Sequence, residues 1–146
     1  AGTSPAAMTE FNLSFQPTSA TSKLYFFASI NQSVQSGDQA NFYFYNSTDS
    51  EVVGDIGTAE GSRLRLQWGG RVGDAAFSAN HSFATWYEPS STDDKAYQIF
   101  GNGHAANTLG INRTYDNPDN NSIRSARCCS TFTITEYDGS IATIST

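Results

Sequence analysis

Histidine is the side chain best suited to acid–base chemistry near neutral pH, and the chain has two of them. His81 lies in a strand-like run and His104 lies in a Gly-rich loop. A Ser-His-Asp arrangement is defined by its geometry, and a chain this rich in serine has no spacing that singles one out. We therefore expect both histidines to lie at the surface or in an interface, and we expect no catalytic residues and no enzymatic activity.

Two acidic stretches are the candidates for a metal site. Asp93-Asp94 and the run 116–120 (Asp-Asn-Pro-Asp-Asn) offer the oxygen ligands that calcium prefers. Neither stretch has the Asp-x-Asp-x-Asp-Gly spacing of a calcium-binding loop, and Asp and Asn also cap their own backbone in turns. We expect solvated turns at both places, with no metal and no cofactor.

The two cysteines, Cys128 and Cys129, are adjacent in the chain. On a strand their side chains would point to opposite faces, and a disulfide between neighbours is strained. Two thiols alone do not make a zinc site. The sequence leaves two possibilities open: a pair of reduced, partly buried thiols, or an interchain disulfide at a symmetry axis.

Aromatic side chains are the remaining candidates for binding, because sugar rings stack on exposed aromatics. Trp68 is set apart, since alternation places it on the core face of its strand. Outward aromatic residues on an acidic domain more often cover a subunit interface, where Tyr and Trp are enriched. We predict an interface made of the first residues of the chain and four aromatic residues: Ala1, Gly2, Thr3, Ser4, Pro5, Tyr43, Tyr45, Trp86 and Tyr87.

The composition indicates a folded domain with an acidic surface of low charge density. Of 146 residues, 13% are aromatic and 15% are charged, which is the opposite of a disordered chain. Abundant Ser, Thr, Asn and Gly are typical of an all-β protein with many turns. The net charge of −6 disfavours nucleic acid as a partner. No apolar run approaches the ~20 residues that span a bilayer, so we expect no membrane partner.

Apolar and polar residues alternate through most of the chain, which is the pattern of half-buried strands, and no segment has the helical period. We predict strands at 10–16, 23–30, 41–45, 62–68, 75–88, 95–100, 109–113 and 130–136. The predicted fold is an all-β antiparallel β-sandwich, jelly-roll-like, with about eight strands. Residues 1–9 are predicted to form a short extended N-terminal arm, and residues 10–146 a single domain.

The predicted core follows from the facing of each strand. It contains Phe11, Leu13, Phe15, Leu24, Phe26, Phe42, Phe44, Leu64, Leu66, Ile99, Ile111, Phe132 and Ile134.

Three segments, taken in order, resemble a family of small β-sandwich domains in virion proteins of tailed phages. The first is 15–24 (Phe-Gln-Pro-Thr-Ser-Ala-Thr-Ser-Lys-Leu), where a strand ends in Pro-Thr and a Ser-Lys pair begins the next. The second is 87–97 (Tyr-Glu-Pro-Ser-Ser-Thr-Asp-Asp-Lys-Ala-Tyr), in which Glu88 replaces the family's usual Asp and 93–95 replaces a run of Thr and Ala. The third joins 109–114 (Leu-Gly-Ile-Asn-Arg-Thr) to 130–137 (Ser-Thr-Phe-Thr-Ile-Thr-Glu-Tyr).

The resemblance covers most of the chain, from Phe11 to Tyr137. It implies a jelly-roll-like domain, usually trimeric, that serves as a capsid decoration or as the head of a tail fibre or spike. It carries over no catalytic residue. Asn112, Arg113 and Glu136 fall on positions that hold strand ends by hydrogen bonds.

Of these roles, the sequence favours a trimeric capsid decoration (cement) protein that stabilises the head. No heptads of a fibre shaft are visible, and the polar arm could lie across neighbouring subunits. The expected partners are further copies of the chain and the major capsid protein, with a host-surface glycan as an additional partner. The alternatives are a tail-fibre or spike receptor-binding head, and a secreted carbohydrate-binding module. The expected location is the virion surface, or outside the cell if the protein is not viral.

Overall fold

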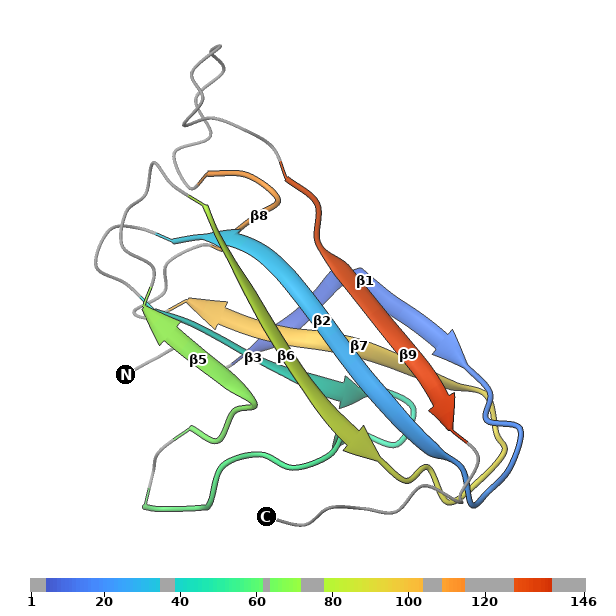
Figure 1. The fold of residues 1–146 in the computed structure, drawn as a ribbon. Coiled ribbons are helices and arrows are strands. Elements are labelled where there is room, and N and C mark those ends of the chain that lie inside the picture. The colour runs from blue at the N-terminus through green and yellow to red at the C-terminus, as the bar shows by residue number, and fades with distance from the viewer. Residues whose placement is uncertain are drawn as a thin grey trace.

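The computed structural model describes residues 5–34, 39–61, 64–71, 78–103, 109–114 and 128–137. These residues include nine strands: β1 (Ala6–Phe15), β2 (Lys23–Ser33), β3 (Gln39–Asn46), β4 (Glu51–Val52), β5 (Trp68–Arg71), β6 (Ala79–Tyr87), β7 (Lys95–Gly103), β8 (Gly110–Ile111) and β9 (Thr131–Tyr137). Figure 1 shows two sheets, with β6, β2 and β9 toward the viewer and β1, β7 and β3 behind them. The predicted all-β antiparallel sandwich is confirmed.

The back sheet has the order β1-β7-β3, and β4 and β5 both pair with the free side of β3 at its two ends. The front sheet has β2 at its centre, with β6 on one side and both β9 and β8 on the other. The chain crosses between the sheets after β1, β2, β5, β6 and β7. These crossings bring strands that are far apart in the sequence side by side.

The two sheets meet at a group of aromatic rings. Phe26 of β2 and Phe44 of β3 are fully buried, with ring centroids 5.5 Å apart. Phe44 also packs against Phe83 of β6 at 4.7 Å and against Phe132 of β9 at 5.5 Å. One residue of the back sheet therefore contacts all three long strands of the front sheet, so its packing fixes how the two sheets face each other.

The observed core contains most of the predicted one. The predicted residues that are buried are Phe11, Leu24, Phe26, Phe42, Phe44 and Ile99, and those half-buried against them are Phe15, Ile111, Phe132 and Ile134. Leu66 is half-buried in the connection before β5. The core also contains residues outside the prediction: Met8, Ala28, Ile30, Val34, Ala40, Val53, Phe83 and Tyr97.

Two predicted core residues are wrong. Leu13 is 37% exposed, because it lies on β1 at the edge of the back sheet. Leu64 is 50% exposed and lies outside any strand. The strand predicted at 62–68 is therefore also wrong; the strand here is β5, which begins at Trp68 and runs through the glycines that were expected to end it.

Packing explains why β5 contains Gly69 and Gly70. A Cβ atom on Gly70 would lie 2.7 Å from the indole ring of Trp68, and one on Gly69 would lie 2.8 Å from Oδ1 of Asn41. The glycines leave room for these two side chains to lie over the strand. In a sequence, two adjacent glycines usually indicate the end of a strand. Here they lie inside a strand, because neighbouring side chains pack closely against its backbone.

The N-terminal part of β1 corrects the extent of the predicted arm. Ala6, Ala7 and Met8 pair with Gly101, Phe100 and Ile99 of β7, in that order, and Met8 is buried. The register shifts between Met8 and Asn12, so Met8 and Phe11 are both buried at a spacing of three residues. Because simple alternation does not produce this spacing, the sequence pattern placed the start of the strand too late. Residues 1–4 lie outside the described residues.

We expect Phe44→Ala to lower the free energy of unfolding by about 3–5 kcal/mol, because it removes a fully buried ring and leaves a cavity between the sheets. The matched control is Leu64→Ala, which truncates a large apolar side chain that is half exposed. It should change the free energy of unfolding by less than about 0.5 kcal/mol. Denaturant titrations of both variants measure the difference, and similar losses in the two would contradict the assigned core.

Candidate functional site

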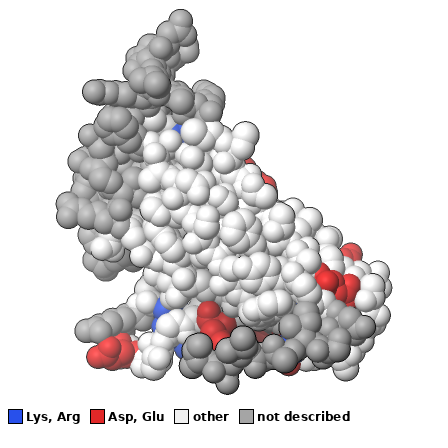
Figure 2. All heavy atoms as spheres, in the orientation of Figure 1, with Lys and Arg blue, Asp and Glu red and all other residues white. Residues whose placement is uncertain are grey.

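The outer face of the front sheet carries almost no charge. Its outward side chains are Asn80, Ser82, Ala84 and Trp86 on β6, Lys23, Tyr25, Phe27, Ser29 and Asn31 on β2, and Thr131, Thr133, Thr135 and Tyr137 on β9. We call it the Trp86 face. Lys23 is the one charged residue among them, and it forms an ion pair with Glu88 at 3.2 Å. Figure 2 views this face directly and shows charged side chains along its borders.

Three aromatic rings gather at one end of the Trp86 face, one from each long strand. Tyr25 is the cross-strand partner of Trp86, and their ring centroids lie 4.9 Å apart. Tyr137 of β9, the strand on the other side of β2, lies 5.2 Å from Trp86. Trp86 is 46% exposed and Tyr137 is 36% exposed. The strand register, rather than nearness in sequence, assembles this aromatic trio.

The outer face of the back sheet carries a second aromatic group, which we call the Tyr43 face. Phe100 of β7 lies 5.6 Å from Tyr43 and 4.4 Å from Tyr45, both on β3. All three rings are half-buried against one another. Burial, and to a smaller extent Tyr45, raises the pKa of Tyr43. The amide side chains of Asn41 and Asn102 lie on the same face and are joined by a hydrogen bond of 3.1 Å.

The structure separates the residues of the predicted interface. Trp86 lies on the front sheet, whereas Tyr43 and Tyr45 lie on the outer side of the back sheet, so the two groups face opposite directions. Pro5 is half-buried just before β1. The residues Ala1, Gly2, Thr3 and Ser4 lie outside the described residues. The sequence reasoning missed Tyr25, Phe100 and Tyr137, which only the register brings beside the expected aromatics.

Tyr87 belongs to neither outer face. Its ring lies between the sheets, 6.1 Å from Phe26 and 6.2 Å from Tyr97. Its hydroxyl donates a hydrogen bond of 2.5 Å to Oε1 of Glu51. Burial, followed by the bond to Glu51, raises the pKa of Tyr87 to about 12. Tyr87 is therefore a structural link between the front sheet and β4.

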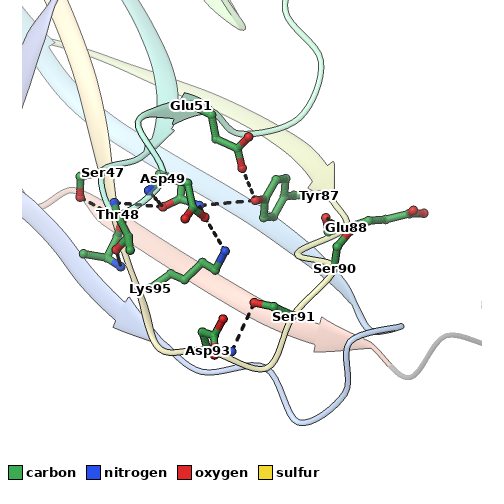
Figure 3. A network of polar contacts seen from close by, with 12 residues as sticks. Ser47, Thr48, Asp49, Glu51, Tyr87, Glu88, Ser90, Ser91, Asp93 and Lys95 are labelled. Carbon is green, nitrogen blue, oxygen red and sulfur yellow. Dashed lines mark hydrogen bonds and ion pairs between the residues drawn. The ribbon is translucent and has the colours of Figure 1, made fainter.

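Tyr87 is part of a polar network that joins the β3–β4 turn to β7 (Figure 3). Asp49 forms an ion pair with Lys95 and accepts a hydrogen bond of 2.7 Å from Asn46. These two partners, Lys95 first, hold the pKa of Asp49 below its ordinary value. Thr48 accepts a hydrogen bond of 2.9 Å from the backbone N–H of Ala96. Each of these polar groups is occupied in holding the turns together, which indicates a structural role.

His81 is half-buried. It occupies an inward position of β6, where alternation places it, and its ring lies 4.1 Å from that of Trp68. Burial lowers the pKa of His81, which favours the neutral ring. His104 lies outside the described residues.

The acidic and thiol candidates for metal binding are dispersed. The backbone N–H of Asp93 donates to Oγ of Ser91 at 3.3 Å, as in a turn capped by its own side chains. Cys128 is half-buried and Cys129 is exposed, and both are free thiols. Within the part of the chain that the structure describes, no three His, Cys, Asp or Glu side chains are grouped to hold a metal ion. The stretch 116–120 lies outside that part.

Two residues singled out by the phage-domain resemblance do hold strand ends. Asn112 accepts a hydrogen bond of 2.6 Å from Ser130, and its backbone N–H donates to the carbonyl of Asn31. Glu136 accepts hydrogen bonds from the backbone and hydroxyl of Thr18, at 2.7 and 2.8 Å. For Arg113 the contact is made by its carbonyl oxygen, which accepts from Ser33.

Comparisons with known protein families and with curated proteins find no match for this chain. Among the described residues, no helix has the length and apolar character needed to cross a membrane.

The raised pKa of Tyr87 gives a test of the network. A raised pKa means that the protonated hydroxyl stabilises the fold, fully below pH 10 and progressively less as the pH rises toward 12. We expect a tyrosinate absorbance step near pH 12 that Tyr87→Phe removes. Glu51→Gln should move this step to lower pH, because it replaces the acceptor carboxylate by a neutral amide. A step that neither variant alters would show that Tyr87 does not donate to Glu51.

Proposed function

We propose that the chain is a non-enzymatic structural protein of a bacteriophage particle, which acts at the particle surface by contact. The observation that carries this proposal is the distribution of charge. In the described residues, charged side chains lie mostly at strand ends and in turns, and the two sheet faces keep aromatic, hydroxyl and amide groups. Such faces suit binding, and the order of segments that resemble phage virion domains supports the same class of role.

The specific role that we propose is a trimeric capsid decoration protein in which the Tyr43 face packs against neighbouring copies. Chains with a net charge of −6 repel one another, which favours contact between copies where charge is sparse. Half-buried tyrosines and a phenylalanine, flanked by amides that can hydrogen-bond, match the composition of interface cores. Docking of the trimer on the major capsid protein would then stabilise the head.

The arm has a smaller part in this proposal than its predicted length suggests. Ala6–Thr9 belongs to β1, where the backbone of Ala6, Ala7 and Met8 is paired with β7. Residues 6–9 are therefore held in the sheet, and in this proposal the faces and loops of the sandwich make the contact with the capsid.

A second role, the receptor-binding head of a tail fibre or spike, is favoured by one observation. Trp86 is 46% exposed on a face that the proposed trimer contact does not use. An exposed indole is a common anchor for a binding partner, because it offers a large rigid surface at low entropic cost.

We expect the purified chain to have the mass of three copies in light scattering after size exclusion. Tyr45→Ala and Phe100→Ala should each weaken the association by about 30-fold or more, as expected for truncation of a hot-spot residue worth at least about 2 kcal/mol. The control is Tyr137→Ala, an aromatic truncation on the opposite sheet. A monomeric parent, or a trimer that resists both truncations, would contradict the proposed contact.

Location distinguishes the two roles. We expect the trimer to co-sediment with empty expanded capsids of the phage that encodes it. Binding to host cells without binding to capsids would favour the fibre head, and binding to neither would contradict the virion proposal.

A further inference from the structure

We propose that Trp86, Tyr25 and Tyr137 form a stacking site for a neutral carbohydrate, an uncharged glycan of pyranose rings. The site goes beyond the proposed structural role and does not depend on whether the protein lies on the head or on a fibre. Four observations carry it: the exposed area of the trio, the groups around it, the charge of its surroundings, and the packing that holds Trp86 in place.

The exposed area of the trio is the size of a small ligand. A fully buried aromatic side chain covers ~150–250 Å². Exposures of 46% and 36% therefore leave roughly 150–200 Å² open on Trp86 and Tyr137. An area of this size matches the apolar C–H face of one or two sugar rings.

The groups around the trio suit a ligand with many hydroxyls. Thr135 is the other cross-strand partner of Tyr25, and Thr133 and Thr131 continue the row of hydroxyls along β9. Threonine is under-represented among the residues that dominate binding between proteins. A glycan needs such hydroxyls, because each buried sugar hydroxyl must find a hydrogen-bond partner.

The charged groups nearest the trio favour a neutral ligand over an anionic one. Lys23, the register partner of Tyr137, is already paired with Glu88, whose side chain is 71% exposed. The exposed carboxylate can accept charge-assisted hydrogen bonds from sugar hydroxyls. It would repel a sulfated, phosphorylated or carboxylated sugar, and so would the net charge of −6 of the whole chain.

Close packing of Gly54 fixes the backbone that presents Trp86. Gly54 has φ of +68°, and a Cβ atom there would lie 2.6 Å from the carbonyl oxygen of Trp86 and 2.2 Å from Oγ1 of Thr85. The segment after β4 therefore presses directly on β6 at Trp86. A ligand site held in this way loses little freedom on binding, which improves affinity.

The test uses the full chain and a panel of defined oligosaccharides. The neutral members are hexamers of glucose, mannose and N-acetylglucosamine, and the anionic members are a uronic acid hexamer and sialyllactose. We expect at least one neutral hexamer to bind in calorimetry and to change the tryptophan fluorescence, while the anionic members do not bind. Trp86→Ala should weaken that binding at least tenfold, and Trp86→Phe, which keeps an aromatic face, should weaken it less.

Leu64→Ala, which truncates an exposed side chain outside the trio, is the control and should bind the hexamer as the parent does. Because Trp86 is nearly half exposed, we expect Trp86→Ala to fold, and circular dichroism and thermal melting check this. Tyr137→Ala gives a second, independent variant.

Absence of binding to every neutral member would overturn the proposal, as would unchanged binding by Trp86→Ala and Tyr137→Ala. A fall in the number of copies caused by Trp86→Ala would instead identify the trio as a contact between copies. Capsid co-sedimentation is measured separately, so failure of the glycan site leaves the structural role to be judged on its own.

Discussion

The contact between Phe26 and Phe44 is the constraint on which the other features depend. Both rings are fully buried and come from the central strands of opposite sheets. Because side chains alternate along a strand, placing Phe26 inward sends Tyr25 and Phe27 outward, and placing Phe44 inward sends Tyr43 and Tyr45 outward. A slip of one residue in either strand would bury the tyrosines and expose the phenylalanines. The same alternation that places phenylalanines in the core therefore places the aromatic residues of β2 and β3 on the outer faces.

This dependence explains what sequence could predict. Where a strand is central and regular, as in β2 and β3, alternation alone predicted the facing of Leu24, Phe26 and Phe44. Alternation did not predict the strands at the edges of the back sheet. In β1 a register shift buries Met8, and in β5 close packing against the glycines lets the strand continue past Trp68. The aromatic trio and the Tyr43 face were only partly predicted, because their members come from strands whose pairing is a long-range property of the fold.

Charged groups lie mainly at the strand ends and in the turns, and the outer faces of the sheets carry mainly uncharged side chains. Asp49, Glu51 and Lys95 satisfy one another and Tyr87 at one end of the sandwich, and Glu136 holds the β1–β2 turn. Charges placed in these turns stay solvated and cost little, whereas charges on the sheet faces would have to be desolvated in any contact. The separation therefore leaves both faces free to be covered.

The two faces differ in a way that suits different partners. On the Tyr43 face the rings stack on one another and are half-buried, so a partner would meet a broad surface that is already ordered. On the Trp86 face the rings are more exposed, tilted by 51° and 60°, and followed by a row of threonines, which offers a small apolar patch next to hydroxyls. Because the faces lie on opposite sides of packed sheets, about 10 Å apart, occupation of one does not block the other. A domain of this kind can be held in an assembly by one sheet while it presents the other to the surroundings.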